Sequence, residues 1–257
     1  MKNTIYIGII IIRYPKIKKP KGEIMDNYNM NYDEAKTGIS GFNPFMTKVF
    51  LWMFAGLFAS FATAFGVAHS PTMLSMLYSS RAGLLVMIIV EFALVIMITN
   101  GLSRYSYGQA AAMFMIYSVI NGFTMAYIFI AYNIGTISVA FITASLVFAA
   151  MAIQGAVTKR DLSRLGSFLM MVLFGVIIAM LVNFFVRSSA MDLMISIITV
   201  FIFAGLTAWD MQKLQTIYKS YGNSVAMNNV AIMGALALYL DFINMFLRIL
   251  YIFGRRD

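Results

Sequence analysis

The sequence contains no cysteine, a single histidine and few charged residues. Without cysteine, the chain can form neither a disulfide bond nor a thiolate metal site. With His69 as its only histidine, a metal site built from several histidines is excluded and a catalytic triad is not expected. Charged residues make up 11% and hydrophobic residues 61% of the chain, whereas soluble domains have about 25% and about 45–50%. The composition therefore predicts an integral membrane protein.

Seven apolar stretches follow one another along the chain, each close to the roughly 20 residues that a helix needs to cross a bilayer. The runs are continuous and do not alternate as the strands of a membrane barrel do. Short joints separate them, so neighbouring helices should be antiparallel. We predict an all-α integral membrane fold of seven transmembrane helices over residues 44–257, preceded by an N-terminal tail over residues 1–43. The predicted spans are residues 46–68, 83–102, 108–131, 135–157, 165–186, 190–211 and 228–253.

The basic residues between these stretches favour a cytoplasmic N-terminus, because cytoplasmic loops carry an excess of lysine and arginine. If residue 46 lies on the cytoplasmic side, that side holds eight such residues and the opposite side four. The first group is Lys36, Lys48, Arg104, Lys159, Arg160, Arg164, Lys213 and Lys219, and the second is Arg81, Arg187, Arg255 and Arg256. The pair at the C-terminus opposes this orientation, and a re-entrant last helix would place that pair inside. We expect seven full spans with the tail outside.

The first 24 residues differ from the rest of the chain. Their apolar run is too short to span a bilayer, and no small-residue cleavage site follows it, which argues against a signal peptide. The basic segment that follows the run suits a membrane-surface anchor. Alternatively, residues 1–24 result from a mis-called start codon, because codons for residues 21–23 can contain a purine-rich ribosome-binding sequence. We expect translation to begin at Met25 or, less favourably, at Met30.

Two aspartates interrupt the last two apolar stretches, Asp210 and Asp241. A carboxylate at membrane depth is costly and is rarely kept without a partner or a function. If the two meet, they should share one proton, because two carboxylates a few Å apart cannot both ionise cheaply in a low dielectric. Loss of that proton would replace a hydrogen bond with repulsion and would offer oxygen ligands to a hard cation such as calcium.

Two conditions govern whether these aspartates meet. Asp210 lies near the end of its stretch, where water could solvate it, and Asp241 is the deeper residue. They approach each other only if the helix of Asp210 continues beyond Gln212 or the last helix starts later than residue 228. Asn244 and Arg248 follow Asp241 at i+3 and i+7 and share its helix face. Arg248 is either a counter-charge or a residue that extends its head group to the interface.

A third acidic residue, Glu91, lies in the middle of the stretch 83–102. It could pair with Arg248, line a cation path or bond a neighbouring helix. Arg104 ends the same stretch on the cytoplasmic side. Polar residues in the next stretch, Asn121 and Thr124 among them, are expected to form hydrogen bonds between helices rather than to line a pore.

The two acidic segments carry a family resemblance. Tyr239-Leu-Asp241-Phe-Ile-Asn244 is similar to the last-helix signature of the Bax inhibitor-1 family, also called the transmembrane Bax inhibitor motif family. Ala208-Trp209-Asp210-Met-Gln212 resembles the other acidic element of that family, with Trp209 where a tyrosine is usual. The resemblance as a whole covers about residues 43–254. Its other elements are the entry to the first helix at residues 41–50, Tyr117-x3-Asn121-Gly122 and Leu165-Gly166.

The resemblance implies a bundle whose last helix is buried among six others and a hydrogen-bonded, pH-sensing pair, Asp210 and Asp241, that gates a passive calcium leak. Calcium would be bound by this pair, and Asn244 and Gln212 could supply further oxygen ligands. The residues expected to support the pair are Asn244, Arg248, Glu91, Arg104 and Gln212. Relatives tend to carry a basic cluster near Arg104 that can latch the pair, and this chain has Arg104 alone. A bacterial branch is tied to a membrane-bound ATP-dependent protease, so a protease modulator is the alternative function. The expected setting is the bacterial inner membrane, with no enzymatic activity, cofactor or nucleic-acid partner.

Two other classes of membrane protein fit the residues less well. An intramembrane aspartyl protease also uses two aspartates on neighbouring helices, but it needs Gly-x-Gly-Asp around one of them. Here the corresponding residues are Leu238-Tyr-Leu-Asp241. A proton-coupled transporter is not expected either, since the sequence shows no internal repeat or pair of broken helices.

Overall fold

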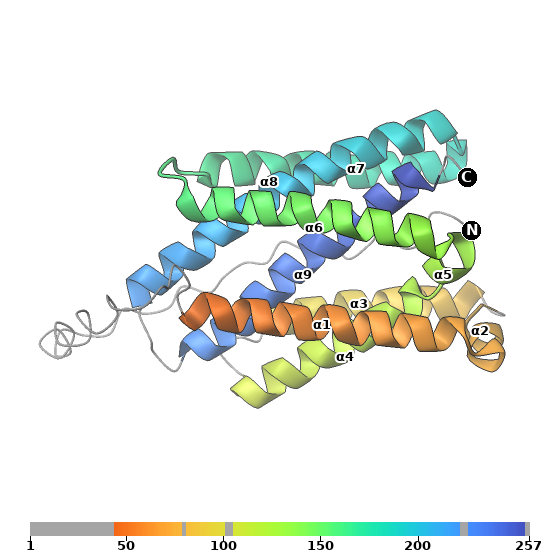
Figure 1. Cartoon of the computed structure of the whole chain (residues 1–257), viewed down its shortest axis with the longest axis horizontal. Coiled ribbons are helices and arrows are strands. Elements are labelled where there is room, and N and C mark those ends of the chain that lie inside the picture. Colours follow the sequence, from red (N-terminus) through yellow and green to blue (C-terminus); the bar gives the residue numbers. More distant parts are fainter. Residues whose placement is uncertain (1–43, 79–80, 101–104, 222–225, 255–257) are drawn as a thin grey trace, which may run out of the picture.

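The computed structural model describes residues 44–78, 81–100, 105–221 and 226–254, and the regular structure in these residues is helical (Figure 1). The helices are α1 (Pro44–Ala68), α2 (Pro71–Tyr78), α3 (Arg81–Asn100), α4 (Tyr107–Met125), α5 (Ile128–Ala131), α6 (Ile134–Val157), α7 (Ser163–Val186), α8 (Ser189–Tyr221) and α9 (Ala226–Phe253). The predicted start of translation, at Met25 or Met30, lies outside the described residues, as do Lys36, Arg104, Arg255 and Arg256.

Six helical segments among the described residues are long and apolar enough to cross a membrane. They are α1, α4 together with α5, α6, α7, α8 and α9, and they correspond to six of the seven predicted spans. The remaining prediction, residues 83–102, coincides with α3, whose described apolar part is the shorter helix Ile89–Ile98. The all-helical membrane fold is therefore confirmed, and the count of seven spans stays a prediction.

Local hydrogen bonds explain where several helices begin and end. At the start of α4, the Ser106 side chain accepts from the backbone N–H of Gln109, and the Gln109 side chain accepts from the backbone N–H of Ser106. This reciprocal arrangement satisfies two N–H groups that the first turn leaves without partners. Asn133 Oδ1 accepts from the backbone N–H of Thr136 at 2.8 Å at the start of α6. Arg187 ends α7 with a φ of 58°, the left-handed conformation that commonly closes a helix.

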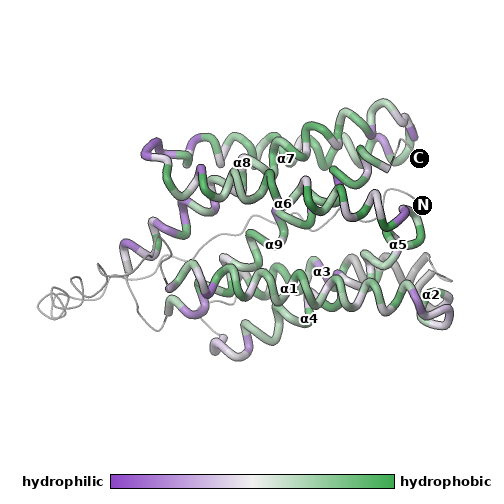
Figure 2. The backbone as a smooth tube through the Cα atoms, viewed as in Figure 1, coloured by the Kyte–Doolittle hydropathy of each residue, from purple (hydrophilic) through white to green (hydrophobic). Residues whose placement is uncertain are grey.

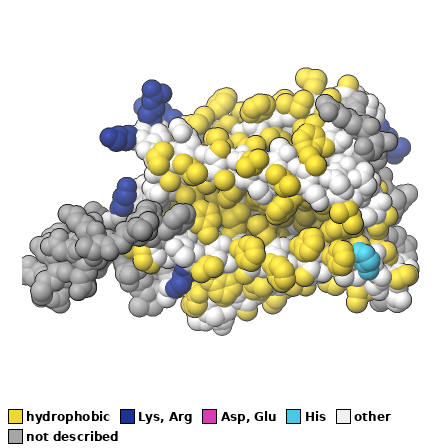
Figure 3. All heavy atoms as spheres, in the orientation of Figure 1, with side chains coloured by type: hydrophobic (Ala, Val, Ile, Leu, Met, Phe, Trp, Pro, Cys, Tyr) yellow, Lys and Arg dark blue, Asp and Glu magenta, His cyan; other side chains and the backbone are white. Residues whose placement is uncertain are grey.

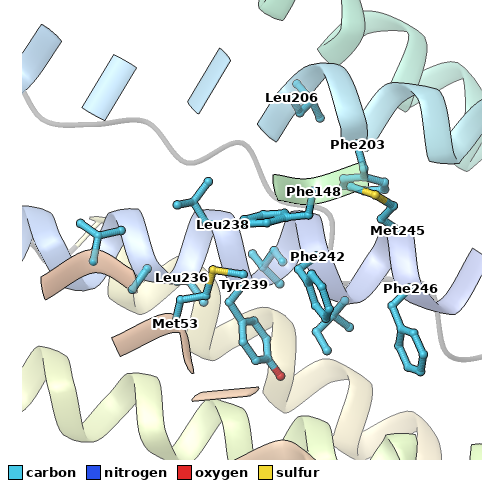
Figure 4. Close-up of a cluster of buried hydrophobic side chains, with 14 of the residues drawn as sticks. Met53, Phe148, Phe203, Leu206, Leu236, Leu238, Tyr239, Phe242, Met245 and Phe246 are labelled. Atoms are coloured by element: carbon cyan, nitrogen blue, oxygen red, sulfur yellow. The ribbon is translucent and has the colours of Figure 1, made fainter. Parts of the chain in front are cut away.

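Helix α9 lies at the centre of the bundle and packs against α8, α1, α6 and α4 (Figure 1). An 18-residue apolar stretch of α9 is completely buried, whereas the corresponding stretches of α6 and α7 are 22% and 17% buried. Side chains from α1, α6 and α8 surround α9 in the core, among them Met53, Phe148 and Phe203 (Figure 4). The burial of the last helix, which the family resemblance implied, is thus confirmed for the described helices.

The outer faces of the bundle are apolar. Large hydrophobic side chains such as Phe58, Leu146 and Phe185 are more than 60% exposed, which suits a surface that contacts lipid rather than water. Hydrophobic residues dominate the middle of the helices and hydrophilic residues gather toward their ends (Figure 2). Lys and Arg collect mainly at the end of the visible face away from the single histidine (Figure 3).

Glycines allow α8 to approach its neighbours closely near Asp210. A Cβ at Gly155 of α6 would collide with the carbonyl oxygen of Ala208, and a Cβ at Gly166 of α7 would collide with the ring of Trp209. Both contacts lie within two residues of Asp210 along α8. The absence of side chains at these two glycines therefore fixes the distance between α8 and the helices beside it.

Candidate acidic pair between α8 and α9

Helix α8 runs to Tyr221, so it continues well beyond Gln212. This meets one of the two conditions under which Asp210 and Asp241 were expected to meet. Because α8 and α9 pack against each other, the carboxyl of Asp241 lies close enough to that of Asp210 for the two to interact electrostatically. The fold thus places the two acidic residues of the last spans on facing helices.

Asp241 is the more deeply buried of the two, as expected, with 5% of its surface exposed, while Asp210 is partly exposed. The side chain of Thr207 on α8 lies next to the carboxyl of Asp241. Among the described residues, Oδ2 of Asp241 has no hydrogen-bond partner. A buried carboxyl oxygen without a partner is costly, so this atom marks the point at which a proton or a cation would be stabilised.

Thr207 is a residue of this site that the sequence analysis did not identify. It is completely buried on α8, three residues before Asp210, and its hydroxyl also lies 2.8 Å from the carbonyl oxygen of Phe203. Its spacing from Asp210 was the available signal, since residues three apart share a helix face. A threonine at that spacing is common in apolar helices, where it usually bonds its own backbone, so spacing alone did not single it out.

The part of α8 that carries Asp210 is also close to a cation. Lys213 lies one turn further along α8 and interacts electrostatically with Asp210. Its ammonium group sits 4.5 Å from the centre of the Trp209 ring, within the range of a cation–π contact. Asp210 therefore has a positive neighbour on its own helix, and Asp241 has Asp210 as its electrostatic neighbour.

The Gln212 side chain is bonded away from the acidic pair. Its Oε1 accepts from the backbone N–H of Leu162 at 2.8 Å, and its Nε2 donates to the carbonyl oxygen of Arg160 at 2.8 Å. Both ends of the side chain are thus bonded to the connection between α6 and α7. Gln212 fastens that connection to α8, and it does not contribute an oxygen to the acidic pair in this arrangement.

Removing this link should loosen the connection locally. We expect Gln212→Ala to speed amide hydrogen exchange at Leu162, whose N–H loses its acceptor, and to lower the free energy of unfolding by about 1–2 kcal/mol. Exchange measured by mass spectrometry on peptides covering residues 158–164 tests this. Gln215→Ala, one turn further along the same helix, is the matched control and should leave that exchange unchanged. Equal exchange in both variants would contradict the assigned role.

Two polar residues that follow Asp241 on the last helix are buried and bonded elsewhere. Asn244 is 6% exposed and donates from Nδ2 to the carbonyl oxygen of Leu240 in its own helix at 2.8 Å. Arg248 is 3% exposed and donates to the hydroxyl of Ser196 on α8 and to the sulfur of Met180 on α7. Arg248 therefore acts within the protein interior, which excludes the expectation that its head group extends to the interface.

Glu91 bonds a neighbouring helix, one of its three expected roles. It is 7% exposed on α3, and its Oε1 lies 2.9 Å from the hydroxyl of Thr124 on α4. Arg104, the expected latch, lies outside the described residues. Within the described residues, no group of three or more acidic, histidine or cysteine side chains could hold a metal ion. A calcium site at Asp210 and Asp241 would therefore need neutral oxygens as well.

The fold and the site together define a multi-pass α-helical membrane protein with a buried last helix whose aspartate faces an acidic residue of the preceding helix. A family model described as inhibitor of apoptosis-promoting Bax1 matches residues 42–257. The chain therefore belongs to the Bax inhibitor-1 family, as its two acidic segments indicated.

Several bacterial proteins are similar to this chain over almost their whole length. The inner membrane protein YbhL of Escherichia coli K12 is 39% identical over 219 residues, which cover 84% of this chain and 94% of the relative. An uncharacterized protein of Borreliella burgdorferi is 39% identical over 215 residues, or 83% and 93% of the two chains. An uncharacterized membrane protein of Streptococcus pyogenes serotype M6 is 37% identical over 233 residues, or 90% and 100%.

Proposed function

We propose that this protein is a pH-sensitive calcium leak channel of the bacterial cytoplasmic membrane, gated by the pair Asp210 and Asp241. The observation that carries the proposal is Oδ2 of Asp241, which is buried on α9 without a partner among the described residues, while Asp241 interacts electrostatically with Asp210 of α8. Membership of the Bax inhibitor-1 family supports it, because the resemblance implies such a leak. The name of the E. coli relative, an inner membrane protein, supports the location.

The surroundings of Asp241 support a proton on the pair in the arrangement described. The single hydrogen of the nearby Thr207 hydroxyl has an acceptor in the carbonyl oxygen of Phe203, and Oδ2 of Asp241 has no hydrogen-bond partner among the described residues. An ionised Asp241 would therefore lack a donor at that oxygen. A protonated Asp241 also avoids placing a second negative charge beside Asp210. We therefore assign this arrangement to the closed, protonated channel.

Loss of the proton would open the path. Two ionised carboxylates repel each other, which favours separation of α8 and α9 at this level, and they attract a divalent cation. Calcium takes roughly six to eight oxygen ligands, so the aspartates would supply part of the set. The side-chain oxygen of Asn244, backbone carbonyls and water would complete it, and the site would form only on opening.

Charge at the two ends of the bundle supports a cytoplasmic N-terminus. Lys48 lies near the start of α1, while Lys159, Arg160 and Arg164 lie in or beside the connection between α6 and α7. The start of α1 and the end of α6 lie at the same end of the bundle, and α9 finishes at the other (Figure 1). We propose that the first of these ends faces the cytoplasm.

Calcium flux across pH tests the channel directly. Because deprotonation opens the site, we expect calcium uptake into proteoliposomes holding the full chain to rise as the pH increases between about 6 and 8. Empty liposomes provide the background at each pH. A flux no greater than that background would refute the channel and would favour the alternative, an interaction protein that modulates a membrane-bound protease. A flux that does not change with pH would refute the gating.

A further inference from the structure

A second polar cluster occupies another face of α9. Tyr239, two residues before Asp241, donates from its hydroxyl to Oδ1 of Asn121 on α4 at 2.9 Å, and that hydroxyl lies 2.7 Å from Oγ of Ser60 on α1. The Asn121 side chain also lies next to Glu91 on α3, and Oε1 of Glu91 lies 2.9 Å from the hydroxyl of Thr124 on α4. These contacts connect four helices, α1, α3, α4 and α9, through side chains that are each less than 9% exposed.

The hydrogen bonds of Thr124 bear on whether Glu91 carries a proton. The Thr124 hydroxyl has one hydrogen, and it lies 2.8 Å from the carbonyl oxygen of Asn121 and 2.9 Å from Oε1 of Glu91. If Thr124 donates to the carbonyl oxygen, the contact with Glu91 is a hydrogen bond only when Glu91 is the donor.

The surroundings of Glu91 also favour a protonated carboxyl. Its hydrogen-bond partner Thr124 and its neighbour Asn121 are both neutral. Among the described residues, the titratable groups that face it from the packed helices are two phenols, Tyr117 of α4 and Tyr239 of α9. Among the described residues the Tyr117 hydroxyl, which is fully buried, has no hydrogen-bond partner. An ionised carboxylate would be a strong acceptor for that hydroxyl, and a buried charge with neutral partners alone would be costly.

We infer that Glu91 is a proton-binding site, distinct from Asp210 and Asp241, which holds its proton in a hydrogen bond to Thr124 and thereby fastens α3 to α4. Through Asn121 and Tyr239, the same cluster fixes α9 against α1 and α4. One face of α9 is thus held by a neutral network, while the face toward α8 carries Asp241. The inference rests on the contacts of Glu91 and does not depend on whether the protein conducts calcium.

Infrared difference spectroscopy of the purified full chain tests it. A protonated carboxyl and an ionised carboxylate absorb in separate regions, and only the carboxyl band shifts in heavy water. At neutral pH we expect the Glu91→Gln protein to lack one carboxyl band of the wild-type spectrum and to keep all of its carboxylate bands. Asp161→Asn, which alters an exposed acid of the connection between α6 and α7, should show the opposite pattern.

A second variant covers the case in which Glu91→Gln does not fold. In Thr124→Val, which keeps the shape of the side chain and removes its oxygen, the carboxyl band should persist but shift in frequency, since Glu91 loses its acceptor. A wild-type minus Glu91→Gln spectrum that shows lost carboxylate bands would overturn the inference. A carboxyl band at the same frequency in Thr124→Val and in the wild type would overturn it as well. So would a wild-type spectrum whose carboxyl bands are all removed by Asp210→Asn and Asp241→Asn.

Discussion

Replacing Asp241 with asparagine should give a channel that stays nearly closed and no longer responds to pH. An asparagine at this position has the shape of a protonated carboxyl, and its amide can donate a hydrogen bond toward Asp210 while it cannot ionise. Calcium flux at pH 8 should fall roughly 5- to 150-fold, the usual range of coupling between two interacting sites. Calcium uptake into proteoliposomes at several pH values measures this.

Asp210→Asn should also remove most of the pH dependence, but for a different reason. Asp210 is partly exposed and lies beside Lys213, whereas Asp241 is buried and would then face no second carboxyl. A lone carboxyl at that depth should stay neutral, so calcium binding should weaken together with the flux. The measurement that separates the two variants is calcium affinity.

The double variant and a surface control complete this series. If the two residues act through one proton, the double variant should conduct no less than either single variant, because coupled residues are not additive. Asp161→Asn should keep the wild-type flux and pH response, since Asp161 is exposed in the connection between α6 and α7. Additive losses, or an unchanged pH response in either single variant, would show that the aspartates do not share a proton.

Gly155→Ala should destabilise the protein by forcing α6 away from α8. The added Cβ would collide with the carbonyl oxygen of Ala208, and backbone atoms cannot move aside as the end of a flexible side chain can. Overpacking of this kind typically costs about 1–3 kcal/mol. Because Ala208 lies two residues before Asp210, the separation of α6 from α8 should also reduce calcium flux. Thermal unfolding in detergent measures the loss of stability.

Gly175→Ala is the matched control for this prediction. Gly175 is exposed on α7, and a Cβ there would meet nothing within 4 Å. Alanine favours a helix over glycine by up to about 1 kcal/mol, so this variant should unfold at the wild-type temperature or slightly above it. A Gly155→Ala protein as stable as Gly175→Ala would mean that α6 and α8 are not held as closely as described.

The sequence was sufficient for the fold class because continuous apolar runs leave little choice of structure in a bilayer. Six of the predicted spans match described helices within a few residues at most boundaries. The main difference is α8, predicted over residues 190–211 and observed over Ser189–Tyr221. Its last turns contain Gln212, Lys213 and Gln215, so hydropathy marks the edge of the membrane there and not the end of the helix.

The sequence also singled out Asp210, Asp241 and Glu91 as candidates, because an acidic residue in an apolar helix is conspicuous. Their partners were harder to predict. Thr207 contacts Asp241 from the neighbouring helix, and Ser60 contacts Tyr239 from a residue 179 positions away. Such pairings depend on the rotation of each helix about its axis, which packing determines. Gln212 shows the converse, since a side chain close to an aspartate in sequence is bonded to a loop in space.

Proton release on calcium binding tests the shared proton most directly. In a weakly buffered solution of the purified protein near pH 6.5, addition of calcium should displace the proton held by Asp210 and Asp241, and a pH indicator should report about one proton per chain. Asp241→Asn should release none. Calcium binding by the wild-type protein without proton release, or equal release from the variant, would contradict gating by this pair.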